Sequence, residues 1–292
     1  METPPLDAPI IIASLIILAV LLTSAVLWIR QVQRPRDLIE TNQGVDAWSI
    51  GWVNFGIFIC AMITAVFVAQ QLGLAFMLGP EAGSVTELTP WLAVGAVILL
   101  QGPMLAVFYL ARRFYPGHYA SRLSRVDLSF GESFKLAVPL FFMLLPVIWI
   151  ATLLWSNVLS GLQQAGIVEE FAPQELVTLF QSGGDWAAMF LLMLMAVIVA
   201  PVVEEIIFRG CIYRFLKSQI SLFSAQLVSG VVFAVLHANV LSFVPLVIVG
   251  IVLARVYEKS GSLAVAIWFH AFFNAFSLLM LYISSFSDAF PK

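Results

Sequence analysis

The stretch IIIASLIILAVLLTSAVLWI, from Ile10 to Ile29, decides the fold class because it contains no charged side chain. A helix needs about 20 apolar residues to cross the hydrocarbon core of a bilayer. Only helices and closed barrels satisfy their backbone groups in lipid. A barrel strand would instead alternate apolar and polar residues over about ten positions. The unbroken run therefore predicts a transmembrane helix.

The composition of the whole chain agrees with this prediction. Of its 292 residues, 61% are hydrophobic and only 11% are charged, and the mean hydropathy is +1.00. Soluble domains contain about 25% charged residues, so the lipid bilayer must solvate most of this chain. The net charge of −3 indicates no nucleic-acid partner.

Seven further apolar stretches are long enough to be membrane helices, so we expect an all-α, polytopic bundle of about eight transmembrane helices. The eight expected segments are residues 10–29, 50–72, 91–110, 136–155, 186–209, 221–238, 242–257 and 263–284.

Charges in the connecting loops alternate in sign along the chain. Four loops are basic; they contain Arg30, Arg34 and Arg36, then Arg112, Arg113, Arg122, Arg125 and Lys135, then Arg209, Arg214 and Lys217, and finally Arg255 and Lys259. The positive-inside rule places these loops in the cytoplasm and both termini outside. We expect a multi-pass protein of a bacterial cytoplasmic membrane.

In the acidic outer loop 156–185, residues 174–181 are expected to form a short interfacial helix.

Ionisable residues inside the bilayer are costly and indicate function, and they gather in the C-terminal part of the chain. The first group is Glu204-Glu205-Ile206-Ile207-Phe208-Arg209, just after Pro201. Residues four apart share a helix face, so Glu205 and Arg209 can pair. Glu204 lies about 100° around the helix from Glu205, which leaves its carboxylate free for chemistry. The alternative is a structural charge cluster near the helix end.

Two histidines occur in the following apolar segments. His237 comes four residues after Phe233, and His270 comes four residues before Asn274. Each pair alone is compatible with a structural histidine or with hydrogen bonding between helices. Together with the glutamates, they predict one polar site built from three helices.

These three motifs, in this order, resemble those of the CPBP intramembrane proteases. That family includes the type II CAAX prenyl endopeptidases and bacteriocin-processing enzymes. The resemblance covers residues 186–284, which we expect to form the catalytic helical core, whereas residues 1–185 match nothing specific. It implies that Glu204 is the catalytic glutamate and His237 its partner. His270 and Asn274 would complete the site, with Glu205, Arg209 and Phe233 in support.

The resemblance implies an endopeptidase that cuts a peptide or protein substrate in or at the membrane, such as a prenylated one. Two mechanisms fit these residues. In the favoured one, Glu204 activates water as a general base, and His270 and Asn274 donate hydrogen bonds to the oxyanion. In the other, His237, His270 and Glu204 bind Zn²⁺, which activates the water.

One geometric difficulty and two other functions remain open. If the helix 186–209 ends near Arg209, Glu204 lies near the inner face of the membrane and His237 near the outer face. The two meet only if the fifth helix is long, tilted or broken; continuation to about Lys217 would suffice. The alternative functions are a catalytically silent scaffold or bacteriocin self-immunity protein on the same fold, and a proton-coupled carrier.

Overall fold

The computed structural model describes residues 8–33, 44–79, 89–168, 179 and 184–286, and within these ranges the regular elements are all helices. The expected interfacial helix at residues 174–181 lies outside the described residues, apart from Leu179. The helices before the polar motifs are α1 (Ala8–Gln33), α2 (Trp52–Leu78), α3 (Pro90–Phe114), α4 (Pro116–Tyr119) and α5 (Phe130–Gln164).

The C-terminal helices contain all three motifs. A continuous helical segment from Trp186 to Gln219 consists of α7 (Trp186–Leu194), the π-helical η2 (Met195–Val199), α8 (Ala200–Glu204), the π-helical η3 (Glu205–Tyr213) and α9 (Arg214–Gln219). It is followed by α10 (Leu222–Leu236), α11 (Phe243–Ser260) and α12 (Leu263–Ser284).

All eight expected segments are helical, but the expected number of membrane spans is not confirmed. Six helical segments in the described ranges are long and apolar enough to cross a bilayer. The two that do not qualify are α10, which has only 15 residues, and α11, whose last turns contain Arg255, Glu258 and Lys259. The fold is therefore the expected polytopic helical bundle, with two shorter helices inside it.

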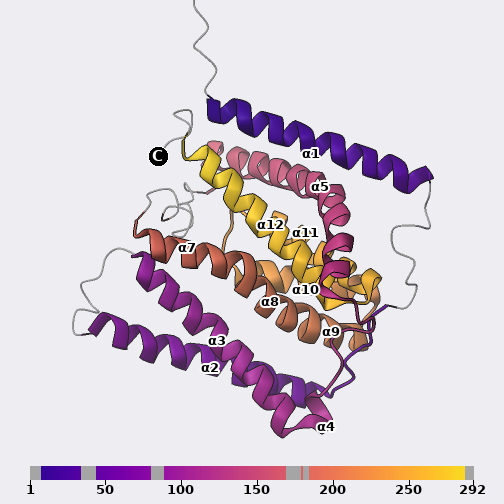
Figure 1. The fold of residues 1–292 in the computed structure, drawn as a ribbon. Helices are drawn as coiled ribbons and strands as arrows, with labels where there is room; N and C mark the ends of the chain where they lie inside the picture. Colours follow the sequence, from indigo (N-terminus) through magenta and orange to yellow (C-terminus); the bar gives the residue numbers. More distant parts are fainter. Residues whose placement is uncertain (1–7, 34–43, 80–88, 169–178, 180–183, 287–292) are drawn as a thin grey trace, which may run out of the picture.

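The helices are arranged as a core flanked on two sides (Figure 1). The core contains α5, α10, α11 and α12, which bury Phe141, Phe233, Leu253 and Phe269 against one another. On one side α1 packs against α5 and α12, and on the other the α2–α3 pair packs against α7. The motif helices thus lie in the best-packed part of the molecule.

The described parts of the four basic loops lie at the same end of the bundle. Arg214, at the start of α9, donates to the main-chain oxygen of Asp46 and to the hydroxyl of Ser121. The main chain of Arg125 donates to Gly261 O, before α12. This common end is the one that the positive-inside rule predicts to be cytoplasmic.

A capping box lengthens α5 beyond its expected start. The Ser129 hydroxyl accepts from the Glu132 N–H, and the Glu132 carboxylate accepts from the Ser129 N–H at 2.8 Å. The spacing Ser-x-x-Glu is a known signal for a helix start. As a result α5 begins six residues before the expected segment 136–155; at its other end it also extends nine residues beyond that segment.

The carboxylate of Asp185 caps the other end of the motif segment. It accepts hydrogen bonds from the N–H groups of Ala187 and Ala188 at 2.9 and 3.2 Å. Three hydrogen bonds hold the pKa of Asp185 below its ordinary value of 3.8. In order of decreasing effect, they come from the Ala188 N–H, the Trp91 side chain and the Ala187 N–H. A charged cap also interacts favourably with the helix dipole.

This lowered pKa predicts how pH affects stability. A carboxyl group with a depressed folded-state pKa stabilises the fold fully above its unfolded-state value, here 3.8, and loses this contribution as pH falls through the lower folded-state pKa. The difference in Tm between wild type and Asp185→Asn should therefore shrink below pH 3.8. The exposed Asp127, changed to Asn, is the control. A Tm difference for Asp185→Asn that stays constant across this range would contradict the assignment.

Candidate active site

The length of the segment Trp186–Gln219 removes the geometric difficulty raised by the sequence. The expected end near residue 209 was wrong, because the helical path continues for ten more residues to Gln219. Fifteen residues separate Glu204 from Gln219, and fifteen separate Leu222 from His237 across the turn. Since the two arms run in opposite directions with similar rises per residue, Glu204 and His237 lie at the same height.

Glu204 lies between two imidazole rings. Its Oε2 atom is 3.9 Å from His237 Nε2 and 3.7 Å from His270 Nε2. These distances exceed those of direct hydrogen bonds, and Glu204 Oε2 is buried without a hydrogen-bond partner among the described residues. Three polar atoms from three helices thus surround one position where a small polar species can bind.

Hydrogen bonds at the opposite ring nitrogens fix the orientation of both histidines. His237 Nδ1 lies 2.7 Å from the main-chain oxygen of Phe233, and His270 Nδ1 lies 2.8 Å from Glu205 Oε1. Both oxygens can only accept, so each Nδ1 must hold a hydrogen. In a neutral ring the Nε2 atom is then an acceptor that faces Glu204. His237 is 29% exposed, whereas His270 is only 3% exposed.

The predicted pairing of Glu205 with Arg209 is confirmed. Arg209 Nη1 donates to Glu205 Oε1 at 2.8 Å, and neither side chain is exposed. Arg209 Nη2 also donates to Gly250 O at 3.1 Å. Because Glu205 accepts from His270 as well, the buried pair holds α12 beside the motif segment.

Phe233 forms the apolar wall of the site. Its ring centroid is 4.3 Å from that of His237 and 5.8 Å from that of His270. The Arg209 guanidinium lies 4.7 Å from the same ring, within range of a cation–π interaction. The predicted supporting residue therefore contacts all three polar groups.

Asn274 contacts the main chain of η2. Its Nδ2 atom donates to Ala196 O at 2.8 Å. In the π-helical register Ala200 N–H donates to Met195 O, so the next donor, to Ala196 O, would be residue 201. That residue is Pro201, which has no N–H. Asn274 thus satisfies a carbonyl that the proline leaves unpaired, about two turns before Glu204.

The charges of the buried cluster do not balance. Glu204 and Glu205 supply two carboxylates, and among the described residues Arg209 supplies the one guanidinium that pairs with either of them. An uncompensated charge in a low-dielectric interior is strongly unfavourable. A proton on His270 or a bound cation would therefore stabilise the cluster.

The side chains of Glu204, His237 and His270 have the chemistry of a zinc site, but their spacing does not suit a bound zinc ion. Two neutral imidazoles and a carboxylate are common zinc ligands, and both Nδ1 atoms have the hydrogen-bond partners that orient such ligands. However, no group of three or more His, Cys, Asp and Glu side chains in the described ranges has the spacing to hold a metal ion.

Comparison with known proteins points to the same segment. Residues 186–276 match the family described as type II CAAX prenyl endopeptidase Rce1-like. The resemblance inferred from the three motifs is thus confirmed over these residues. This Rce1-like segment contains Glu204, Glu205, Arg209, His237, His270 and Asn274.

The Rce1-like segment also resembles a curated bacterial protein. The "Putative membrane peptidase YdiL" of Bacillus subtilis (strain 168) is 32% identical over 90 residues, which are 31% of this chain and 37% of that protein. The chain therefore matches well under half of the relative's length. No solved structure matches this chain.

Two glycines that the sequence did not single out bring the helices of the Rce1-like segment together. A Cβ atom at Gly250 would lie 2.6 Å from the Cα of Gly230, so α10 and α11 meet backbone to backbone. The main-chain oxygen of Gly250 is also the acceptor for Arg209. A single glycine in an apolar helix gives no signal of such a contact without knowledge of the helix that faces it.

The close contact predicts a large effect of one methyl group. Gly250→Ala should force α10 from α11 and destabilise the protein by about 1–3 kcal/mol, with His237 displaced. Gly102→Ala is the matched control, since a Cβ there meets no atom within 4 Å. Thermal unfolding in detergent measures both. Equal Tm values for the two variants would show that the contact at Gly250 is not restrictive.

Proposed function

We propose that this chain is an intramembrane endopeptidase in which Glu204 activates water for attack on a peptide bond. The observation that supports this most strongly is the position of Glu204 Oε2, 3.7 and 3.9 Å from the Nε2 atoms of two oriented histidines. The matched family is described as a prenyl endopeptidase and the bacterial relative as a membrane peptidase, which is the same class of reaction.

The reaction can be written with these side chains alone. Glu204 Oε2 takes a proton from a water molecule held between it and the acceptor Nε2 of His237. The water oxygen bonds to the carbonyl carbon, and the C–N bond then breaks as Glu204 returns the proton to the leaving nitrogen. Glu204 ends the cycle as a carboxylate.

His270 is proposed to stabilise the oxyanion as an imidazolium. Its buried Nδ1–H donates to Glu205, and a second proton on Nε2 would balance the two carboxylates and Arg209. The Nε2–H then donates to the oxyanion. Asn274 was expected to share this task. Since its Nδ2 donates to Ala196 O, we propose that it acts mainly by holding the turn before Glu204.

The substrate is proposed to be a peptide at or in the membrane, such as a prenylated or lipid-proximal one, in a bacterial cytoplasmic membrane. The apolar groove of about 330 Å³ between α5 and α12 is lined by Phe272 and Phe276. Around α12, Phe272 lies about 160° and Phe276 about 120° from His270. The groove therefore faces away from the site and gives no support for a particular substrate.

Comparing protein termini in cells tests the proposal. Membranes from cells with wild type or Glu204→Gln, at equal expression, are compared by terminus-enriched mass spectrometry. We expect new termini with wild type that are missing with the variant, and these also identify the substrate. Identical termini would instead favour the silent scaffold or self-immunity function.

Metal removal distinguishes the two mechanisms. We expect cleavage by the purified protein to persist after prolonged treatment with a zinc chelator, because Glu204 and a protonated His270 need no metal for charge balance. The control is the same protein treated with the zinc-loaded chelator. Loss of cleavage that Zn²⁺ restores would assign His237, His270 and Glu204 as metal ligands.

A further inference from the structure

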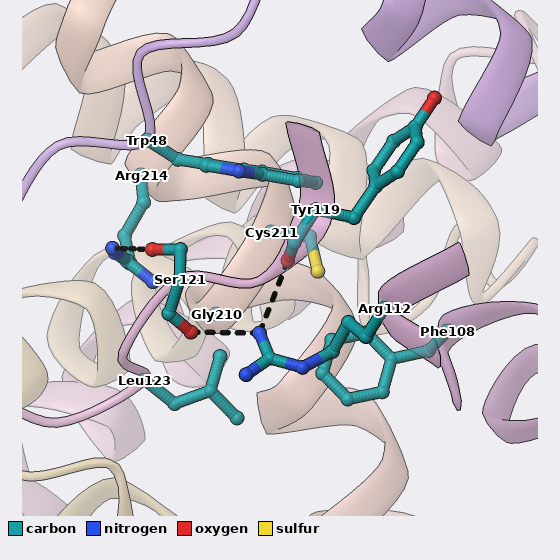
Figure 2. A pocket seen from close by; sticks show the side chains of 9 residues that line it. All are labelled: Trp48, Phe108, Arg112, Tyr119, Ser121, Leu123, Gly210, Cys211 and Arg214. Atoms are coloured by element: carbon teal, nitrogen blue, oxygen red, sulfur yellow. Dashed lines mark hydrogen bonds between the residues drawn. The ribbon is translucent and has the colours of Figure 1, made fainter. Parts of the chain in front are cut away.

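A second polar cluster, which shares no residue with the Glu204 site, lies at the basic end of the bundle; Figure 2 shows its side chains. It surrounds a cavity of about 10 Å³. The lining side chains come from the segment before α2, from α3, α4 and the loop after it, and from η3 and α9; they are Trp48, Phe108, Arg112, Tyr119, Ser121, Leu123, Gly210, Cys211 and Arg214.

Two guanidinium groups approach this cavity on either side of Ser121 (Figure 2). Arg112 Nη1 donates to the main-chain oxygens of Tyr119 and Ser121 at 3.2 and 2.7 Å. Arg214 Nη2 donates to the Ser121 hydroxyl at 2.6 Å, and its Nε donates to Asp46 O at 2.5 Å. All four acceptors are neutral oxygens.

Among the residues that the structure describes, the charge of Arg214 is therefore buried without a carboxylate partner. Arg214 is only 1% exposed, and its Nη1 atom has no hydrogen-bond partner among the described residues. In the same ranges neither Arg112 nor Arg214 forms an ion pair. Of the acids that the structure describes near this cluster, Glu258 pairs with Lys217, and Asp46 is exposed. Buried charges are normally paired, and buried N–H donors normally have acceptors.

The size of the cavity limits what can supply the missing negative charge. About 10–15 Å³ holds one water-sized occupant. A phosphate, a sulfate or the carboxylate of a peptide is too large. A monatomic halide has the required charge and nearly the required size, and it accepts several hydrogen bonds at once.

We propose that this cavity binds a chloride-sized monovalent anion between Arg112 and Arg214. The anion accepts from the unpartnered N–H of Arg214 and offsets the two guanidinium charges. It joins α3 and the loop after α4 to η3, in which Gly210 directly follows Arg209. Chloride is thus a structural ligand of the basic end of the bundle, and the inference does not depend on the proposed peptidase activity.

Thermal unfolding of the full chain in detergent tests the site. Tm is measured in sodium chloride, bromide and gluconate at equal ionic strength. We expect chloride and bromide to raise Tm over gluconate by about 2–4 °C, with saturation as halide concentration rises. Equal Tm values for wild type in chloride and gluconate would overturn the proposal, leaving water as the occupant.

Matched variants and diffraction locate the effect. Arg214→Gln should lose the halide dependence, whereas Arg113→Gln, which removes an exposed charge on the same helix as Arg112, should retain it. If Arg214→Gln does not fold, anomalous diffraction from crystals of wild type grown in bromide tests the site directly. An anomalous peak between Arg112 and Arg214 is expected, and its absence at full occupancy of other bromide sites would refute the assignment.

Discussion

Glu204→Gln is expected to lower kcat for peptide hydrolysis by about 10²–10⁴-fold, the range for loss of a general base. Gln keeps the shape of the side chain but cannot take the proton of a water molecule at working pH. Because Glu204 Oε2 has no hydrogen-bond partner among the described residues, the substitution breaks no hydrogen bond of this atom with them. We therefore expect Tm to change little while turnover is lost.

Glu132→Gln is the matched control for this prediction. Glu132 is an exposed carboxylate in the capping box of α5, and Gln serves equally in such a box. Its kcat should equal that of wild type. A Glu204→Gln protein that cleaves at the wild-type rate would exclude Glu204 as the base.

Breaking the buried ion pair should have the largest effect on stability. Arg209→Met leaves the Glu205 carboxylate buried and without its cation, which typically costs about 3–5 kcal/mol. Lys217→Met is the comparison, since the Lys217–Glu258 pair is 20% and 12% exposed and such pairs contribute less. Denaturant unfolding in detergent measures both losses.

The double variant Glu205→Gln/Arg209→Met separates stability from activity. Removal of both charges should restore part of the stability lost in Arg209→Met. Activity should stay low, because His270 then lacks the carboxylate that accepts from its Nδ1 at 2.8 Å. A double variant with wild-type turnover would show that Glu205 has no role in placing or charging His270.

The sequence predicts the helical segments and the partners four residues apart, because both depend on local periodicity. It fails at the end of the fifth segment. Arg209, Arg214 and Lys217 are typical of a cytoplasmic loop, yet the helical path continues to Gln219. Arg214 and Lys217 have partners far away in the sequence: the main-chain oxygen of Asp46 for Arg214 and the carboxylate of Glu258 for Lys217. Such contacts cannot be inferred from the charge of a residue.

The finer geometry of the site depends on main-chain groups, which have no residue-specific signal. The oxygens of Phe233, Gly250 and Ala196 accept from His237, Arg209 and Asn274 in turn. The last of these acceptors is available because η2 has a π-helical register next to Pro201. The sequence shows Pro201, but not the π-helical register that leaves the Ala196 carbonyl without a main-chain donor.

A single-turnover cleavage in H₂¹⁸O tests the central claim, that Glu204 activates water for direct attack on the peptide bond. The substrate is a peptide spanning a terminus found in cells, and both product and protein are examined by mass spectrometry. We predict one ¹⁸O atom in the new C-terminal carboxyl group and none in Glu204. Transfer of ¹⁶O to the product with ¹⁸O left in Glu204 would contradict the claim, because it would mean that the carboxylate attacks the substrate itself.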